Sequence, residues 1–386
     1  MSNTCKICGG DFFDKTLLCY ENMPKAAQFL PTKETLISDE GISLKLLQCS
    51  LCGTVQLNND PVPYYKDVIR STSFSPAMIE FRKKQFFSLI QTHSLRGKKI
   101  LEIGCGTGEY LPLLQELGVN AFGIEHSAET LKNALLQKKN IIPGFIETAS
   151  TKITNAPFDA FLFFNFLEHL PNPNDVLRGI HYNLSELAVG IIEVPNFDMI
   201  LKEKLFSEFI SDHLFYFTKT TLMHLLEKNG FHVLECTEAW DSYILSATVK
   251  KRSPLPLSSF QEEQEKITQK LHGFTKPFKK IAVWGAGHQA FTMISLSNIT
   301  KKINYIVDSA PFKQNKFTPA THIPIHAPEK LLTDKVDAII VMAAGYSNEV
   351  VKIILEKYDT GMSIAMLHHN DLKVLRHSGS DTFTKI

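Results

Sequence analysis

The sequence predicts an α/β protein in three parts: a small cysteine-rich N-terminal module, a central domain and a C-terminal domain of similar construction. Three observations support this prediction. Two C-x-x-C-G units lie within the first 53 residues. A buried strand runs into a glycine-rich turn in ILEIGCGTGEY at residues 100–110, and another runs into glycines in KKIAVWGAGH at residues 279–288. Strands that alternate with helical segments are typical of Rossmann-like α/β folds with parallel sheets.

Length and charge exclude several classes of protein. A chain of 386 residues can form two or three domains with a substantial core. Its formal net charge of +1 offers no electrostatic footprint for nucleic acid or an anionic membrane. The start of the sequence lacks a basic segment followed by an apolar one, and no apolar run approaches a membrane span. We expect a cytoplasmic protein without nucleic-acid or membrane partners, and the oligomeric state stays open.

The N-terminal module, predicted over residues 1–63, contains two cysteine pairs. Cys5 and Cys8 lie in CKICGG, and Cys49 and Cys52 lie in CSLCGT. Four thiolates within tetrahedral reach favour Zn²⁺ in a closed structural site, because no position is left for water. Unmetallated thiols or a redox pair are the alternatives.

The central domain, predicted over residues 64–250, is organised around three glycines. Gly104, Gly106 and Gly108 alternate where a strand must turn into a helix, which allows the backbone to approach a ligand closely. A P-loop is excluded because Lys and Ser or Thr do not follow, and the dinucleotide fingerprint needs two residues between its last glycines. A tight turn without a ligand is the simpler alternative.

The pattern E-x-G-x-G-x-G that begins at Glu102 resembles motif I of the class I S-adenosylmethionine (SAM) dependent methyltransferases. Glu125 ends the next apolar segment, where a carboxylate can accept hydrogen bonds from both ribose hydroxyls of an adenosine ligand. A plain surface glutamate is the alternative. A third strand is predicted at residues 144–147, and residues 146–149 are expected to contact adenine.

A further buried strand, FDAFLFFNF, leads to the carboxyl edge of the predicted sheet. We expect Asn165, Glu168 and His169 to lie at this edge and face the sulfonium end of the cofactor, with Phe166 also among the cofactor-binding residues. The side chains expected at the acceptor are Glu168, Glu193, Asn196 and Tyr216.

A second chemical focus is the pair Asp212 and His213, which precedes an aromatic stretch. A histidine beside an aspartate can be oriented and made more basic by it, as a general base requires. From the residues alone, His213 can equally be a half-buried side chain that packs against Phe215 and Phe217.

The C-terminal domain, predicted over residues 251–386, follows a Pro/Ser-rich linker and a polar helix. Gly285 and Gly287 lie in a strand-to-helix turn, and Asp308 ends the next strand. The turn lacks the third glycine of the dinucleotide fingerprint, so we expect a scaffold or substrate-binding half rather than an NAD site.

Taken together, the chain resembles the three-domain sugar C-methyltransferases of bacterial deoxysugar pathways. The marks of this resemblance are both C-x-x-C-G units, EIGCGTG, NFLEHLPNP, DHLFYFT and YIVDSAPFKQNKFTPATHIPI. The resemblance implies SAM, a structural zinc and a small-molecule acceptor, namely a nucleotide-linked keto-deoxysugar. It also implies that His213 is the base that generates an enolate, with Asp212 and Tyr216 in the same motif, and that His169 holds a sugar oxygen.

The sequence departs from this family around the sugar. Asp212 replaces a glutamate, Ile69 stands where a tyrosine is common, and GAGHQA replaces GAAAKG. Two other functions therefore stay open: O- or N-methylation of a sugar, and a noncatalytic module that binds a sugar nucleotide or NAD.

Overall fold

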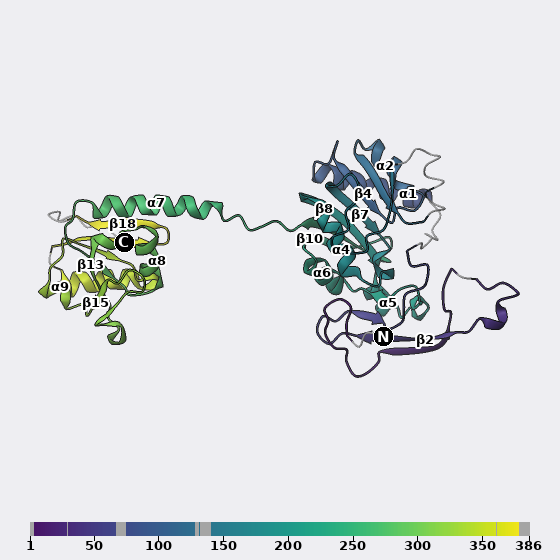
Figure 1. The fold of residues 1–386 in the computed structure, drawn as a ribbon, viewed down its shortest axis with the longest axis horizontal. Coiled ribbons are helices and arrows are strands. Elements are labelled where there is room, and N and C mark those ends of the chain that lie inside the picture. The colour runs from purple at the N-terminus through teal and green to yellow at the C-terminus, as the bar shows by residue number, and fades with distance from the viewer. Residues whose placement is uncertain are drawn as a thin grey trace. The chain divides into compact units, whose positions relative to one another are not determined.

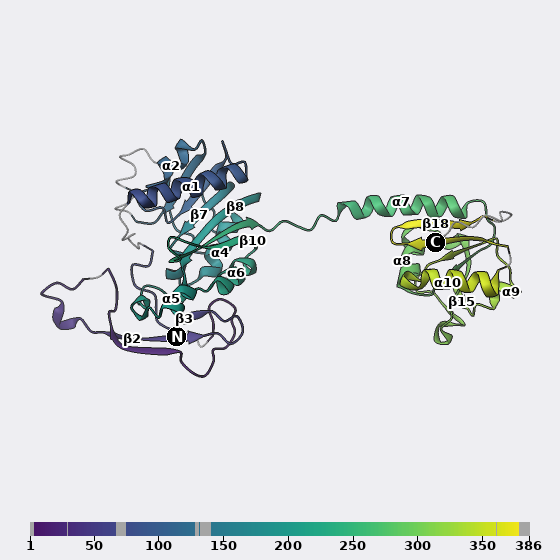
Figure 2. The same cartoon turned by 180° about the vertical axis from the view of Figure 1, so that it is seen from behind.

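The computed structural model describes residues 4–28, 30–66, 75–127, 131, 140–359 and 361–377. The chain divides into two compact units, Met1–Pro254 and Leu255–Ile386, which Figures 1 and 2 show from opposite sides. Each unit has its own sheets and buried apolar clusters, so each is described by itself.

The first unit begins with a four-stranded antiparallel sheet. In spatial order its strands are β1 (Leu18–Met23), β2 (Ile42–Gln48), β3 (Val55–Leu57) and β9 (Phe215–Tyr216). Three of these strands belong to the cysteine-rich module, whereas β9 comes from far along the chain. Leu44, Leu46 and Leu57 pack with Phe197 and Tyr216 in one buried cluster. The cysteine-rich module therefore shares both a sheet and a core with the central domain.

The central sheet has seven strands. In spatial order they are β10 (Phe231–Ala239), β11 (Ile244–Lys251), β8 (Leu184–Pro195), β7 (Phe158–Phe164), β4 (Lys99–Ile103), β5 (Asn120–Glu125) and β6 (Ile141–Pro143). The strands from β8 to β6 are parallel, and β11 and β10 continue the sheet antiparallel. The predicted strand at residues 144–147 is misplaced, because β6 ends at Pro143, which has no N–H to continue the ladder.

Helices cover both faces of this sheet. They are α1 (Pro76–Thr92), α2 (Tyr110–Glu116), α4 (Pro173–Tyr182) and α6 (Lys219–Lys228). The short helix α5 (Phe197–Glu203) packs instead with the four-stranded sheet, through Phe197 and Ile200. Alternate residues of β7 point to opposite faces: Leu162 and Phe164 pack with α1 and α2, and Phe161 and Phe163 pack with α4 and α6. This alternation explains the continuous apolar run of β7, which is buried on both sides. No helix in the described ranges is both long and apolar enough to cross a bilayer.

The second unit is a smaller α/β domain. Its sheet has the spatial order β14 (Lys316–Phe317), β15 (Pro324–His326), β13 (Ile303–Val307), β12 (Ile281–Trp284), β16 (Ala338–Val341), β17 (Ser363–His368) and β18 (Asp371–Arg376). The edge strands β14 and β18 are antiparallel and the others are parallel. Its helices are α7 (Ser258–Thr275), α8 (His288–Leu296), α9 (Lys330–Thr333) and α10 (Ser347–Ile353).

The glycine turn of this unit is closed by its own side chains. Gly285 has a φ of 118°, and a Cβ there would lie 2.4 Å from the carbonyl oxygen of Met342. The Asp308 carboxylate accepts hydrogen bonds from the Ala286 N–H at 2.7 Å and from the Lys313 ammonium at 2.9 Å. Close packing of two strands therefore explains Gly285, and Asp308 holds the turn.

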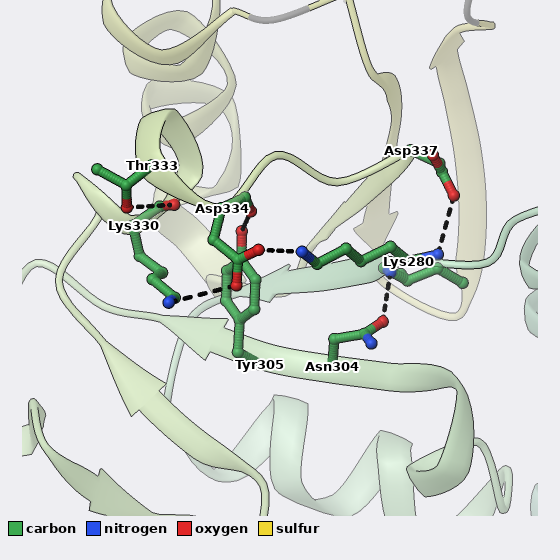
Figure 3. A network of polar contacts seen from close by, with 8 residues as sticks. Lys280, Asn304, Tyr305, Lys330, Thr333, Asp334 and Asp337 are labelled. Carbon is green, nitrogen blue, oxygen red and sulfur yellow. Dashed lines mark hydrogen bonds and ion pairs between the residues drawn. The ribbon is translucent and has the colours of Figure 1, made fainter.

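A polar network ties together the opposite edge of the same sheet (Figure 3). Asp334 forms ion pairs with Lys280 and Lys330, and its carbonyl accepts the hydroxyl of Tyr305 at 2.6 Å. The Lys280 N–H donates to Asp337 at 2.9 Å. These contacts join the starts of β12, β13 and β16, so the network stabilises the fold on the side away from the glycine turn.

Candidate active site

The glycine turn after β4 has the backbone that the sequence predicts. Gly104, Gly106 and Gly108 have φ values of 63°, 57° and 70°, all in the left-handed region. A Cβ on Gly104 would lie 2.9 Å from the ring of Phe166. The turn therefore needs glycine at this position for conformation and for space.

Glu125 lies at the end of β5, beside this turn. Its Oε2 accepts the N–H of Gly106 at 2.8 Å, and its Oε1 accepts the N–H groups of His126 and Ser127 at 2.8 and 2.9 Å. These bonds fix the carboxylate against the glycine turn, and a carboxylate has about four acceptor positions, so it can still accept from a ligand hydroxyl. Glu102, in contrast, is completely buried inside β4.

A small pocket opens at this edge of the sheet. The residues that line it are Lys66, Ile103, Gly104, Ile124, Glu125, His126, Gly144, Phe145, Ile146, Phe166, Leu170 and Val176. Its lining combines apolar walls with one carboxylate, as a nucleoside site requires. Lys66 lies at its rim, where its ammonium pairs with Glu147 at 2.5 Å and lies 5.0 Å from the ring centre of Phe145.

The end of β7 brings the next functional segment to this cavity. Asn165 is exposed and has a φ of 46°, and its N–H donates to the carbonyl of Glu193 at 2.8 Å. A left-handed asparagine turns the chain sharply, so that Phe166 lies over Gly104. The following turn of 3₁₀ helix, Leu167–His169, places Glu168 and His169 at the same edge.

The structure brings Glu168, His169 and His213 together. The rings of His169 and His213 meet edge to face, with their centres 4.8 Å apart. The Nε2 of His169 lies 3.8 Å from Oε1 of Glu168, and its Nδ1 hydrogen-bonds the carbonyl of Asp212 at 2.9 Å. This bond assigns the proton of neutral His169 to Nδ1 and leaves Nε2 as an acceptor.

Burial keeps this cluster uncharged near neutral pH. Burial and the neighbouring His169 lower the pKa of His213 to about 3, and burial lowers the pKa of His169 to about 4. Burial also raises the pKa of the Glu168 carboxyl to about 8. Each shift favours the neutral form because a low-dielectric site penalises the charged form. The expected increase in the basicity of His213 is therefore wrong for the free protein.

The partner of Asp212 also differs from the prediction. Its carboxylate accepts the hydroxyl of Tyr64 at 2.8 Å and the N–H of Ala27 at 2.9 Å. Within the described ranges, no hydrogen bond joins this carboxylate to the imidazole of His213. Asp212 therefore does not orient His213 through its side chain, because the short carboxylate is already held by groups on its other side.

Tyr64 is the site residue that the sequence reasoning missed. It lies next to Tyr65 in a proline-containing connector, VPYYKD, and paired aromatics in such a segment were its only signal. The predicted departure at Ile69 concerns a residue outside the described ranges. Tyr64 nevertheless places a phenol beside the Asp212–His213 segment, and burial and its bond to Asp212 raise its pKa to about 12.

Three predicted acceptor residues use their polar atoms inside the protein. Glu193 is completely buried and pairs with Arg82 at 2.7 Å. Asn196 caps α5, accepting the Met199 N–H at 3.3 Å. The Tyr216 hydroxyl bonds the backbone of Ile210, accepting its N–H at 3.0 Å. The structure explains all three by their contacts within the fold.

The four predicted cysteines converge in the N-terminal module. Cys5 and Cys52 have their sulfurs 3.7 Å apart, and Cys8 and Cys49 have theirs 3.4 Å apart. All four sulfurs lie within 4.8 Å of one another. Tetrahedral zinc with Zn–S bonds of about 2.3 Å requires sulfurs about 3.8 Å apart, so the four side chains fit this ion.

Comparisons with known proteins agree with this geometry. Residues 78–236 match the family described as Methyltransferase domain, and residues 252–366 match the family described as C-methyltransferase C-terminal domain. The chain is a SAM-dependent methyltransferase with a class I Rossmann-like core. Its second matched domain is the one named for the C-methyltransferases.

Individual relatives differ in how much of the chain they cover. The chain is 21% identical over 383 residues to C-methyltransferase NovU of Streptomyces niveus, which covers 90% of this chain and 91% of that protein. It is 33% identical over 92 residues to the ubiquinone biosynthesis O-methyltransferase of Pseudomonas aeruginosa, covering 22% of this chain and 40% of that protein. The solved structure of the PH0226 protein from Pyrococcus horikoshii OT3 is similar at 17% identity with a TM-score of 0.38, covering 50% of this chain and 96% of that one.

Proposed function

We propose that this enzyme methylates a carbon atom of a nucleotide-linked keto-deoxysugar, with His213 as the base that removes the proton. The observation that carries this proposal is the convergence of neutral His213 with His169 and Glu168 near the glycine turn. Among the described residues, the imidazole of His213 has no hydrogen-bond partner, so its lone pair can accept a proton from a substrate. The sugar nucleotide comes from the resemblance stated above, and the C-methyltransferase NovU match supports methylation at carbon.

The cofactor would be held by the cavity at the glycine turn. When SAM is bound, it supplies a methyl group on a sulfonium. Gly104 and Gly106 would bring their backbone close to it, Glu125 would accept a ribose hydroxyl, and Asn165 and Phe166 would lie beside it. The apolar lining and the single carboxylate fit an adenosine.

The acceptor side follows from the protonation states. A carbon next to a ketone is acidic enough for a positioned base to take its proton, and His213 is neutral and so ready to accept it. His169 offers Nε2 as an acceptor, and protonated Glu168 offers an O–H donor. Together they would bind a hydroxyl and a carbonyl of the sugar. An enolate formed by His213 would be a carbon nucleophile for the methyl group that bound SAM would supply.

The remaining parts of the proposal concern domains and metal. The chain would work as a zinc module at residues 1–63, a methyltransferase domain at 64–250 and a substrate domain at 251–386. Cys5, Cys8 and their two partners would bind one structural Zn²⁺, because four sulfurs at these separations leave no position for water.

His213→Ala tests the mechanism. We expect loss of methyl transfer by at least about a hundredfold, in the range of general-base catalysis, with SAM affinity by calorimetry nearly unchanged. His224→Ala is the matched control, because His224 is exposed on α6. The assay uses nucleoside-diphosphate-linked keto-deoxysugars. Retained turnover in His213→Ala would remove this residue from the mechanism.

Deuterium exchange separates C-methylation from O- or N-methylation. In D₂O without SAM, the wild-type enzyme should introduce deuterium at the carbon next to the ketone, since only an enolate mechanism opens that C–H bond. Methyl transfer to the same sugar without such exchange would favour the O-methyltransferase alternative, to which the partial match with ubiquinone biosynthesis O-methyltransferases also points.

A further inference from the structure

The cysteine-rich module contacts the segment that contains His213. We call residues 209–217 the histidine loop. Its last strand, β9, pairs with β3, with Val55 opposite Tyr216 and Gln56 opposite Phe215. The N–H of Leu57 also donates to the carbonyl of Leu214 at 2.9 Å. Strand β3 begins three residues after the last cysteine, so a direct run of backbone connects the four-cysteine cluster to the histidine loop.

A second set of contacts binds the histidine loop at Asp212, immediately before His213. The Asp212 carboxylate accepts the N–H of Ala27 at 2.9 Å and the hydroxyl of Tyr64 at 2.8 Å. The Tyr64 hydroxyl in turn accepts the N–H of Gln28 at 2.9 Å. Asp212 is 3% exposed and Tyr64 is 8% exposed, so these bonds are shielded from water. Shielded hydrogen bonds to a carboxylate are among the stronger polar contacts in a fold.

The central domain also contacts residues 212–214 of the histidine loop. The N–H of Leu214 donates to the carbonyl of Glu168 at 2.9 Å, and Nδ1 of His169 bonds the carbonyl of Asp212. The backbone around His213 is therefore held by contacts with the N-terminal part of the chain and by contacts with the central domain. The His213 backbone is fixed on both sides, while its ring makes no hydrogen bond with any described residue.

We infer that the N-terminal module, together with the connector that follows it, is the positioning element for His213, and that Asp212 is its attachment point through Ala27 of the module and Tyr64 of the connector. Asp212 acts through the backbone of the loop and leaves the imidazole free for the substrate. The consequence for turnover rests on the proposed role of His213 as base, whereas the positioning itself does not.

The test is a double-mutant cycle of Tyr64→Phe and Asp212→Asn in the full chain. Tyr64→Phe removes one hydroxyl at nearly constant volume, and Asp212→Asn removes the charge at nearly constant shape. Tyr358→Phe is the matched control, since it removes a hydroxyl bound to the Glu329 carboxylate at 3.0 Å in the other unit. Amide hydrogen exchange of the peptide covering residues 209–217 is the main readout, together with calorimetry for SAM.

We expect each single substitution to speed exchange in the histidine loop by about tenfold or more, in line with the loss of one charge-assisted hydrogen bond. The double variant should be little worse than Asp212→Asn alone, because Tyr64→Phe removes a hydrogen bond that Asp212→Asn has already weakened. The control and the SAM affinity should not change. Unchanged exchange in the loop, or fully additive effects, would overturn the inference. If Asp212→Asn fails to fold, the loop exchange of Tyr64→Phe alone decides.

Kinetics then separate this inference from the proposed function. Loss of positioning should lower kcat in Tyr64→Phe while the KM for SAM stays constant. Faster exchange in the histidine loop with full turnover would support the positioning inference and refute the role of His213 as the base. Normal exchange with lowered turnover would refute the positioning and leave His213 in place.

Discussion

Replacing Gly104 with alanine tests whether the glycine turn is built for a ligand that approaches closely. An alanine with a φ of 63° pays about 1–2 kcal/mol for the left-handed backbone. Its Cβ would also lie 2.9 Å from Phe166, and such overpacking costs about 1–3 kcal/mol. We therefore expect the free energy of unfolding to fall by about 2–5 kcal/mol. Because Gly104 and Phe166 both line the cavity, a displaced ring should also weaken SAM binding by about tenfold or more.

Gly118→Ala isolates the first contribution, the cost of the left-handed backbone. Gly118 also has a positive φ, 83°, but a Cβ there would meet nothing within 4 Å. It should lose only the backbone cost, with unchanged affinity for SAM. Urea unfolding measures stability and calorimetry measures SAM binding. Equal loss of stability in the two variants would show that the ring of Phe166 moves away from the added Cβ without a cost in stability. Unchanged SAM affinity in Gly104→Ala would refute the assignment of this cavity to the cofactor.

Two further predictions concern the metal and the buried acid. Protein purified without chelator should contain one zinc per chain, and Cys49→Ser should lose both the zinc and the fold of the module; elemental analysis that finds no zinc would contradict this. As the pH rises, the free energy of unfolding should fall in wild type but not in Glu168→Gln. Between the ordinary carboxyl pKa, near 4.5, and about 8, Glu168 keeps its proton in the folded state but loses it in the unfolded state. The stability of wild type therefore falls by about 1 kcal/mol per pH unit across that window, whereas the glutamine amide does not titrate. Parallel stability curves from pH 5 to 8 would exclude the raised pKa.

The sequence by itself determined the features that depend on short spacing. Three alternating glycines after a buried strand specify a tight left-handed turn, whatever the rest of the chain does. Glu125 at the tip of β5 could be placed because the next parallel strand must end at the same edge. The cysteine pairs could be assigned to one cluster because each C-x-x-C unit forms half of a tetrahedral site.

Only the tertiary structure decided which side chains face His213 and which face Asp212. The contacts of Asp212 with Tyr64 and Ala27 span 148 and 185 residues, and its contact with His169 spans 43. No local pattern encodes such pairings, because they depend on how separate elements pack. The sequence could show a histidine beside an aspartate, but the direction of each side chain follows from burial. In the folded protein the aspartate points toward the N-terminal module, and the histidine faces His169.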